Sequence, residues 1–367
     1  MPHSLIDLVG ARPLGLARII IGTAAVIRSG VAWTILRRFD DPEVLRIAVV
    51  DGFVDPASTP AGAFVAAWAV SAIAFTVGWR VPASGLLTAG SIVLYGLLDS
   101  QAYSNHLYLM ALLVILLTLA PADSALAVRG GAGTVPLWPV ELIKLQVSIV
   151  YLFAALTKLN EGFLSGAVLA GTLNGGIVPF PESLRTPGFL SVVAAGAVFT
   201  ELFVATFLWS RRFRPAALVL GGGLHLFITL LIGPTLELVV FSLLMLGTYP
   251  LFLDRRPITV VWDDECGSCR DWIGRFTRFD LLRLLVPIGK SDRTHGLDPS
   301  AVSHAMHTIV PRTGEPEIRA GFDAVNDVLE RTVPGLWVAP LLRLPGVAHL
   351  GRAWYRRQAL RRGCELA

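Results

Sequence analysis

The chain has 367 residues, of which 54% are hydrophobic and only 16% are charged. Soluble globular domains carry about 25% charged residues, so this composition indicates an integral membrane protein. The net charge of +4 comes mainly from arginine, and no basic patch interleaved with aromatic residues is present, so no nucleic-acid partner is expected. Three cysteines, two of them in one Cys-x-x-Cys, do not make the disulfide framework of an extracellular domain.

Apolar runs long enough to cross a bilayer occupy most of the chain before residue 254. A membrane helix needs about 20 apolar residues. Eight segments approach this length, at about 14–36, 61–79, 82–99, 105–122, 140–158, 189–209, 214–233 and 236–253. Arg18 and Arg28 lie in the first segment, where charged side chains face the bundle interior or the headgroups. We therefore predict a mainly α fold, with a transmembrane helical bundle of about eight spans over residues 1–253.

The distribution of arginines predicts the orientation of this bundle. An even number of spans places both termini on one side of the membrane, and cytoplasmic loops carry the excess of positive charge. The loops on the side of the termini hold eight arginines, namely Arg12, Arg80, Arg129, Arg211, Arg212, Arg214, Arg255 and Arg256. The opposite loops hold four, namely Arg37, Arg38, Arg46 and Arg185. We expect a multi-pass protein of the cell inner membrane, with both termini and the C-terminal domain in the cytoplasm.

The character of the chain changes at Asp254. Residues 254–367 combine short β-branched runs with amphipathic segments and dense charge, as soluble α/β domains do. Strands are predicted over 258–263, 282–288 and 307–310, and helices over 266–279, 321–332, 336–342 and 347–361. The sequence therefore predicts a small C-terminal α/β domain after the bundle.

A Cys-x-x-Cys pair stands between the first predicted strand and helix of this domain, in Asp263-Asp-Glu-Cys266-Gly-Ser-Cys269. A helix N-terminus supplies unpaired N–H groups and a positive dipole end, which lower the pKa of a thiol and favour the thiolate. Two intervening residues let the second cysteine attack a mixed disulfide formed by the first. A redox dithiol is the leading interpretation, with Cys266 as the more exposed thiol. Two alternatives stay open: a zinc site with His304 and His307, and a pair of inert core cysteines.

This motif resembles the DCC family of thiol-disulfide oxidoreductases, thioredoxin-like proteins with an Asp-x-x-Cys-x-x-Cys signature. Asp263, Cys266 and Cys269 match the signature position for position, and the likeness extends over about residues 258–364. The resemblance implies a thioredoxin-like fold and no metal. It also implies that Cys266 attacks a disulfide, that Cys269 resolves the mixed disulfide, and that Asp263 holds or accepts a proton beside them. The implied partner is a thiol or disulfide protein, or a small thiol.

The segment from Leu145 to Gly166 begins as a membrane span and ends with a lysine in the same helical pattern. The chain has only three lysines, Lys144, Lys158 and Lys290. A buried amine can lose its proton, whereas a guanidinium effectively cannot. At about 100° per residue, Lys144, Tyr151 and Lys158 share one helix face. Lys158 is therefore a candidate base. The alternative is a lysine that extends its amine from the end of a span to the membrane surface.

Further polar side chains lie within other predicted spans. His106 and Tyr108 open one span, Glu201 lies in another, and His225 follows three glycines at 221–223. Ionisable groups at membrane depth are costly, and they face a cavity or each other. Small residues allow a helix or a ligand to approach closely. These residues are candidates for a binding site, and the alternative is that each only makes a hydrogen bond between helices.

This pattern resembles the HTTM membrane domain, the module shared with vitamin K-dependent γ-glutamyl carboxylase. The matching residues lie in Asn105–Tyr108, in Tyr151–Gly166 with its Lys158, and at Glu201 and His225, within about residues 10–253. The resemblance implies that Lys158 deprotonates a reduced quinone and that His106 and His225 line its pocket. We assign Tyr108, Tyr151 and Glu201 to the same binding site. Glutamate carboxylation is not expected, because no large extracytoplasmic domain follows the bundle.

The predicted function is that of an integral membrane redox protein. The Cys266/Cys269 pair would exchange electrons with a thiol partner, and the bundle would bind a quinone, a hydroquinone or another lipid-soluble substrate. An alternative is a small-molecule transporter or peptide-export accessory whose bundle binds a ligand without catalysis. Transporters often contain internal repeats, and none is evident in this sequence. A third hypothesis is that the bundle only anchors the redox domain.

Overall fold

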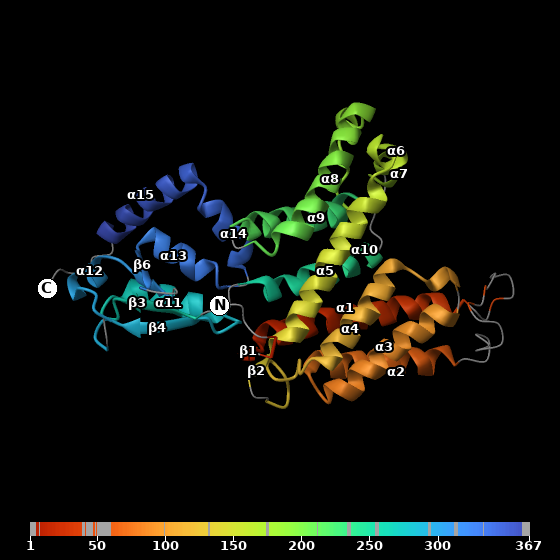
Figure 1. Cartoon of the computed structure of the whole chain (residues 1–367), viewed down its shortest axis with the longest axis horizontal. Coiled ribbons are helices and arrows are strands. Elements are labelled where there is room, and N and C mark those ends of the chain that lie inside the picture. The colour runs from red at the N-terminus through yellow and green to blue at the C-terminus, as the bar shows by residue number, and fades with distance from the viewer. Residues whose placement is uncertain are drawn as a thin grey trace. The chain divides into compact units, whose positions relative to one another are not determined.

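The computed structural model divides into two compact units, one of residues 1–210 with 220–252 and one of residues 211–219 with 253–367 (Figure 1). The second unit thus includes residues 211–219, which the sequence placed in the bundle. The structure describes residues 5–6, 8–38, 41, 47, 49, 60–98, 100–130, 133–173, 176–210, 212–232, 236–253, 257–292, 295–311, 315–332 and 334–361. Most of the chain between the first two predicted spans, residues 37–60, falls outside these residues.

Four apolar helices form one half of the first unit, packing in chain order with α1 against α2, α2 against α3, and α3 against α4 (Figure 1). They are α1 (Arg12–Leu36), α2 (Ala61–Val77), α3 (Val81–Leu98) and α4 (Asn105–Leu119), with the turn η2 (Ser100–Ala102) before α4. Glycines allow the close approach: a Cβ at Gly22 would overlap the side chain of Thr76, and one at Gly85 that of Thr118. Small residues at helix interfaces are typical of membrane bundles.

The other half of the first unit is built around two long helices, α5 (Leu137–Lys158) and α8 (Pro187–Phe207), which pack against each other. A short antiparallel pair joins β1 (Leu8–Gly10) to β2 (Thr134–Pro136), directly before α5. Between and after the two helices come α6 (Glu161–Leu164), α7 (Ala167–Thr172), η4 (Glu182–Leu184), α9 (Arg214–Leu231), α10 (Leu236–Thr248) and η5 (Tyr249–Phe252). Gly166 has a φ of +81°, and its backbone lies against Leu190 of α8.

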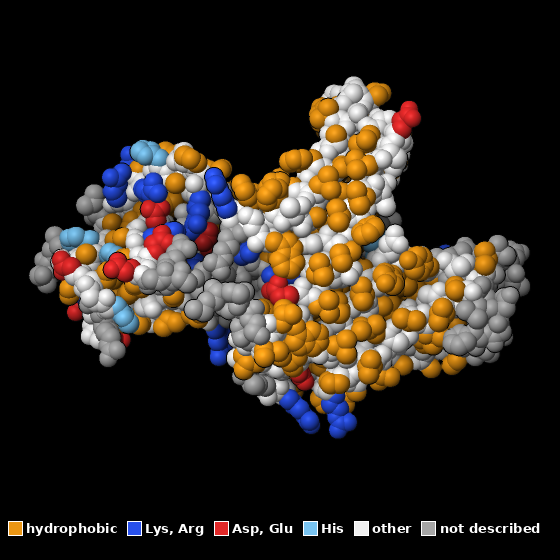
Figure 2. All heavy atoms as spheres, in the orientation of Figure 1, with side chains coloured by type: hydrophobic (Ala, Val, Ile, Leu, Met, Phe, Trp, Pro, Cys, Tyr) orange, Lys and Arg blue, Asp and Glu red, His pale blue; other side chains and the backbone are white. Residues whose placement is uncertain are grey.

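Among the residues that the structure describes, five helices are long and apolar enough to cross a membrane: α1, α3, α5, α8 and α9. Three shorter apolar helices, Ala61–Val77, Asn105–Leu119 and Leu236–Phe252, occupy the remaining predicted spans. Large apolar side chains also lie on the outside of the helices, for example Leu87 of α3 and Val192 of α8. Figure 2 shows such side chains spread over the face of the bundle helices. Apolar side chains facing outward are typical of helices surrounded by lipid, and the chain is a membrane protein.

The two arginines of the first span face the bundle interior, as predicted. Arg18 is fully buried and donates hydrogen bonds to the carbonyls of Phe75 and Thr76, both at 3.0 Å, and to the carbonyl of Leu126. Because the last carbonyls of a helix have no partner within the helix, the guanidinium satisfies the C-terminal end of α2. Arg28 is 3% exposed and is paired with an acidic residue described below.

The second unit contains a four-stranded sheet in the order β4-β3-β5-β6. The strands are β3 (Ile258–Trp262), β4 (Leu285–Gly289), β5 (His307–Val310) and β6 (Glu317–Ala320), and the helices are α11 (Gly267–Phe279), α12 (Pro299–His304), α13 (Phe322–Leu329), α14 (Gly335–Leu342) and α15 (Pro345–Arg361). Strand β3 is parallel to β4 and antiparallel to β5, and β5 is antiparallel to β6. The three predicted strands and four predicted helices of this domain are confirmed, whereas β6 and α12 were not predicted.

The core of this unit lies between the sheet and the helices α11 and α13. It contains Ile258 and Val260 of β3, Phe276 of α11, and Ala324 and Val328 of α13. Ile258 and Val260 are two positions apart on β3 and so face the same side of the sheet, and Ile273 and Phe276 are three positions apart on one face of α11. The alternation that predicts the strand and the spacing that predicts the helix thus bury these side chains together.

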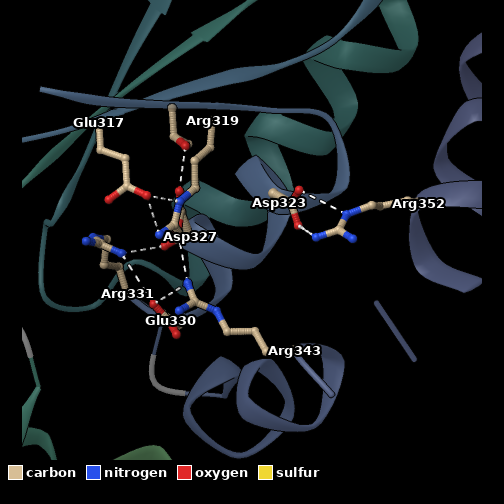
Figure 3. Close-up of polar contacts among 9 residues, drawn as sticks. Glu317, Arg319, Asp323, Asp327, Glu330, Arg331, Arg343 and Arg352 are labelled. Carbon is tan, nitrogen blue, oxygen red and sulfur yellow. Dashed lines mark hydrogen bonds and ion pairs between the residues drawn. The ribbon is translucent and has the colours of Figure 1, made fainter. Parts of the chain in front are cut away.

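A cluster of ion pairs holds α13 to the sheet and to the following helices (Figure 3). Its centre is Asp327, whose side chain is 2% exposed and accepts hydrogen bonds from Thr308 at 2.8 Å, Arg319 at 2.7 Å and Arg343 at 3.0 Å. Because these partners come from β5, β6 and the end of α14, one carboxylate joins four segments. One helical turn earlier, Asp323 makes a more exposed pair with Arg352, at 3.0 and 3.1 Å.

Candidate functional sites

The two motif cysteines lie at the start of α11, in the position that the sequence predicts. Strand β3 ends at Trp262, three acidic residues follow, and Cys266 is the N-cap of α11 with an extended backbone. Its backbone N–H donates to the carbonyl of Asp263 at 3.3 Å. Cys269 stands in the first helical turn. The two cysteines therefore lie at the N-terminal end of α11, where backbone N–H groups lack partners within the helix.

The exposure of the two cysteines is the reverse of the prediction. Cys266 is only 5% exposed, whereas Cys269 is partly exposed. Cys266 is disulfide-bonded in the structure. The prediction of a more exposed Cys266 followed from its position at the helix end alone. An N-cap residue lies where the chain passes from the buried strand to the helix, so its side chain can be covered by both.

Asp263 is buried beside the dithiol and forms an ion pair that the sequence did not reveal. Its side chain is 4% exposed, and its Oδ1 lies 3.0 Å from Nζ of Lys290, which follows β4. Lys290 also contacts Glu265, 2.7 Å from Oε2, and donates to Ser303 at 3.0 Å. The bonds to Glu265 and Asp263 raise the pKa of the Lys290 ammonium above its usual value. The parallel pairing of β3 with β4 brings the two ends together, because both strands end at the same edge of the sheet.

An apolar pocket lies on the other side of the cysteines. It has a volume of about 120 Å³, and its walls include Trp262, Cys269, Trp272, Phe276, Met306 and Trp354. The rings of Trp272 and Phe276 lie 5.8 Å apart on α11. No charged side chain is among the described residues that line this pocket. Cys269 therefore lies next to a surface formed by aromatic side chains, which the sequence analysis did not predict.

The zinc alternative gains no support from the described part of the chain. There, no three His, Cys, Asp or Glu side chains come together as a metal site. His304 ends α12, whereas His307 lies on β5, where its Nδ1 is 2.8 Å from the carbonyl of Ala305. The two histidines that the short spacing suggested as ligands do not assemble with Cys266 and Cys269.

In the bundle, Lys158 at the end of α5 forms an ion pair with Glu201 in α8. Nζ of Lys158 lies 2.5 Å from Oε1 of Glu201, and the side chains are 30% and 6% exposed. The other carboxylate oxygen, Oε2, is buried without a hydrogen-bond partner among the described residues. Phe163 lies beside the pair, with its ring centre 5.8 Å from the ammonium. Lys144 and Tyr151 lie on the buried face of the same helix, in agreement with the predicted shared face.

A second group of polar side chains lies inside the bundle, centred on Tyr151. Its hydroxyl is 2.8 Å from Nε2 of His225 in α9 and 2.6 Å from the hydroxyl of Tyr249 in η5. Nδ1 of His225 is buried without a partner among the described residues. Gly221 makes room for this contact, because a Cβ there would overlap the Tyr249 hydroxyl. Tyr249 was missed by sequence reasoning, since a tyrosine at the end of an apolar run is usually an interfacial residue.

Of the two remaining predicted site residues, His106 lies inside the bundle and Tyr108 lies on its surface. The ring of His106 is stacked on Phe241 of α10 at 4.4 Å, and the ring of His225 lies 5.3 Å from the same phenylalanine. Nδ1 of His106 is also buried without a described partner. Tyr108, by contrast, is 61% exposed. Residues 106 and 108 are two positions apart, or about 200° around a helix, so α4 cannot turn both inward. The assignment of Tyr108 to the same site as His106 is therefore wrong.

An ion pair between α1 and α10 completes the polar interior. Arg28 lies 3.3 Å from Oε1 of Glu237, and its guanidinium stands over the ring of Tyr95 at 5.1 Å. Glu237 was missed, although an acidic residue in the first turn of an apolar helix is itself a signal for a partner inside the bundle.

Comparison with known families finds two domains in the chain. The model of the HTTM domain matches residues 9–256, and that of the DCC1-like thiol-disulfide oxidoreductase matches residues 260–363. These are the two families that the sequence motifs resemble, in the same order. No curated protein and no solved structure matches the chain.

Proposed function

Because the chain belongs to the HTTM family and continues into a DCC1-like thiol-disulfide oxidoreductase domain, we propose that it is a redox protein of the cell inner membrane. Its C-terminal domain exchanges electrons with a thiol or disulfide partner, and its bundle binds a quinone or another lipid-soluble substrate. The observation that carries this proposal is the position of Cys266 and Cys269 at the start of α11, beside the buried pair of Asp263 and Lys290.

The exchange would proceed in two steps once Cys266 is reduced. The thiolate of Cys266 attacks the disulfide of a partner, and one partner thiol leaves. Cys269 then attacks Cys266 in the mixed disulfide, releases the second partner thiol and closes a Cys266–Cys269 bond. The dithiol loses two electrons and the partner gains them. Asp263, three residues before Cys266 and paired with Lys290 at 3.0 Å, would hold or accept a proton beside the two cysteines.

Three further features support a thioredoxin-like fold as the scaffold of this chemistry. A parallel β3–α11–β4 unit places the motif at the strand-to-helix turn. An antiparallel pair, β5 and β6, continues the sheet beside β3. Helix α13 then packs on the same core. This is the arrangement expected from the resemblance to the DCC family.

In the bundle, the unpartnered polar atoms support a ligand site. Glu201 Oε2, His225 Nδ1 and His106 Nδ1 are buried without partners among the described residues, and buried polar groups are normally satisfied. The two oxygens of a quinone can accept hydrogen bonds from the ring N–H groups of His106 and His225 and from the hydroxyl of Tyr151, and a hydroxyl of the hydroquinone can donate to Oε2 of Glu201. When the ligand is a hydroquinone, Lys158 would first pass a proton to Glu201, and its neutral amine would then accept the proton of the hydroquinone. Lys158 and Glu201 form an ion pair, so we expect them to act together. The proton from Lys158 would bind to Oε2 of Glu201, which has no hydrogen-bond partner among the described residues.

The proposed orientation of the protein in the membrane follows from the unequal number of arginines in the loops on its two sides. With eight on the side of the termini and four on the other, the C-terminal domain lies in the cytoplasm, and the Lys158 end of α5 lies on the outer side.

Trapping tests the redox proposal. The full chain, with Cys364→Ser to leave only the motif cysteines, is reduced and mixed with a biotin-labelled alkyl disulfide. We expect Cys269→Ser to retain a reducible biotin adduct on Cys266, whereas the parent loses it through Cys269, and Cys266→Ser forms none. An adduct in Cys266→Ser would assign the attack to Cys269 instead. Stoichiometric zinc and no adduct in either variant would replace the redox proposal by a metal site.

Mass spectrometry of lipids that co-purify with the full chain tests the bundle. We expect a quinone in the wild type and much less of it in His225→Ala, while Tyr108→Ala, outside the interior, retains it. A different bound small molecule, unaffected by redox state, would favour the transporter hypothesis.

A further inference from the structure

The pocket beside Cys269 has the size of a side chain. Its volume of about 120 Å³ is well below the roughly 300–1,000 Å³ of small-molecule sites. A flavin, a nucleotide or an extended quinone ring would not be enclosed there. The pocket would enclose one large apolar side chain of a partner, located next to the cysteine of that partner that reacts.

The walls of the pocket leave aromatic surface in contact with water. Trp272 on α11 is 42% exposed and Trp354 on α15 is 51% exposed, and both line the pocket. Such large apolar surfaces gain free energy when a partner covers them, and tryptophans are the commonest anchors of binding sites. Their position matters here, because Cys269 is part of the same wall. A side chain seated in the pocket brings its neighbouring sulfur to the dithiol.

Charge around the motif argues against an acidic substrate. Asp263, Asp264 and Glu265 directly precede Cys266. Lys290 is already bound to two of these carboxylates, and Arg270 donates to the carbonyl of Asp264 at 2.8 Å. A small thiol that carries several carboxylates would meet this acidic loop, and no charged side chain is among the described residues that line the pocket; the nearby guanidinium of Arg275 is already stacked over the ring of Trp272 at 5.5 Å. A neutral, apolar segment meets no such repulsion.

We infer that the pocket receives an apolar or aromatic side chain adjacent to the partner's cysteine, so that the physiological substrate is a disulfide in an apolar peptide segment. This inference rests on the proposed function. In each turnover, the S–S bond of the peptide breaks and the Cys266–Cys269 bond forms. Two electrons and two protons pass from the dithiol to the peptide, which leaves as two thiols.

Three dipeptide disulfides test this substrate class on the reduced full chain in detergent. They are the disulfide dimers of N-acetyl-Phe-Cys-amide, N-acetyl-Ser-Cys-amide and N-acetyl-Glu-Cys-amide, whose reacting groups are the same. We expect the second-order rate constant for the Phe peptide to exceed that for the Ser peptide by at least about tenfold, because one aromatic side chain is buried. The Glu peptide should be the slowest.

Matched variants locate the preference in the pocket. Trp354→Ala should reduce the Phe/Ser ratio to about twofold, and Leu350→Ala, on the same helix, 70% exposed and outside the pocket, should leave it unchanged. If Trp354→Ala fails to fold, Trp272→Ala repeats the test on α11, with Phe279→Ala as its control. Equal rates for all three peptides, or a fastest Glu peptide, would overturn this inference alone. No reaction with any peptide would overturn the thiol-exchange function with it. A change in oligomeric state with Trp354→Ala would assign the pocket to a second copy of the chain.

Discussion

At the scale of single residues, the lysines are the most informative side chains, because each of the three is engaged by a carboxylate. The pairs are Lys144 with Glu141 at 2.9 Å, Lys158 with Glu201 at 2.5 Å, and Lys290 with Asp263 at 3.0 Å and Glu265 at 2.7 Å. In two of these pairs the carboxylate is buried, with Glu201 6% and Asp263 4% exposed. Each of these two pairs lies at one of the candidate sites, and the proposed function gives both a part in proton transfer.

Lys158→Arg separates the two interpretations of this lysine. An arginine keeps a positive charge beside Glu201 but does not release its proton at physiological pH. We expect the variant to keep the bound quinone and its thermal stability in detergent, and to lose oxidation of an added short-chain hydroquinone. Glu201→Gln serves as the companion variant. Full activity of Lys158→Arg would assign the proton acceptor to Glu201 and end the role of Lys158 as a base.

The Lys290 ion pairs predict a defined pH dependence of stability. Hydrogen bonds to Glu265 and Asp263 raise the pKa of Lys290 above 10.5 in the folded state. The stabilisation is therefore complete below the pKa of the unfolded chain, about 10.4, and is lost as the pH rises through the higher folded value. We expect the difference in unfolding temperature between the full chain and Lys290→Gln to stay constant from pH 7 to about 10 and to shrink above that. A difference that disappears between pH 7 and 9 would contradict this assignment.

At the scale of elements, the second unit depends on α13, whose two aspartates offer a matched comparison. Asp327 is buried with three polar partners, whereas Asp323 has 39% of its side chain exposed and pairs with Arg352 at the surface. Removing one partner of a buried ion pair costs about 3–5 kcal/mol, and of an exposed pair about 0–1 kcal/mol. We expect Asp327→Ala to make the C-terminal domain of the full chain susceptible to protease at clearly lower urea, and Asp323→Ala to have little effect. Equal effects would show that the cluster is not centred on Asp327.

The approach of η5 to α9 depends on Gly221, and the neighbouring Gly223 is its control. A Cβ at Gly221 would overlap the Tyr249 hydroxyl, whereas nothing lies within 4 Å of one at Gly223. We expect Gly221→Ala to disturb the contact of Tyr151 with Tyr249 and to lower both quinone retention and thermal stability. Gly223→Ala should be neutral or slightly stabilising, since alanine favours a helix by about 1 kcal/mol over glycine. The same loss in both variants would mean that helix flexibility, not the tyrosine contact, matters.

At the scale of the whole molecule, the orientation is the property that fixes the redox environment of the dithiol. The arginine asymmetry predicts that the exposed turn η4 is outside the cell membrane and that the loop at Gly130 is in the cytoplasm. In intact cells, a membrane-impermeant thiol reagent should label Ser183→Cys, and should label Gly130→Cys only after permeabilisation. The opposite pattern would place the C-terminal domain in an oxidising compartment, where a reducing role for Cys266 and Cys269 is disfavoured.

The sequence by itself determined most of the long helices, three strands of the C-terminal sheet and the two-part organisation. Apolar runs of bilayer length, the change of composition near Asp254, and the position of Cys266 between a strand and a helix all follow from local patterns. Such patterns are set by the periods of helices and strands and by the cost of burying charge, so they can be read without knowing the packing. The shared face of Lys144, Tyr151 and Lys158 belongs to the same class of prediction.

Only the tertiary structure decided which of these residues meet. Lys158 and Glu201 are 43 residues apart, and Tyr151 is separated from His225 by 74 and from Tyr249 by 98. Nothing in a local pattern specifies such pairings, because they depend on which helix faces pack together. For the same reason, the predictions that Tyr108 points into the bundle and that Cys266 is the more exposed thiol were not met. The ion pair of Lys290 with Asp263 was not predicted at all. Each error concerns the surroundings of a side chain, which are set by segments distant in the chain.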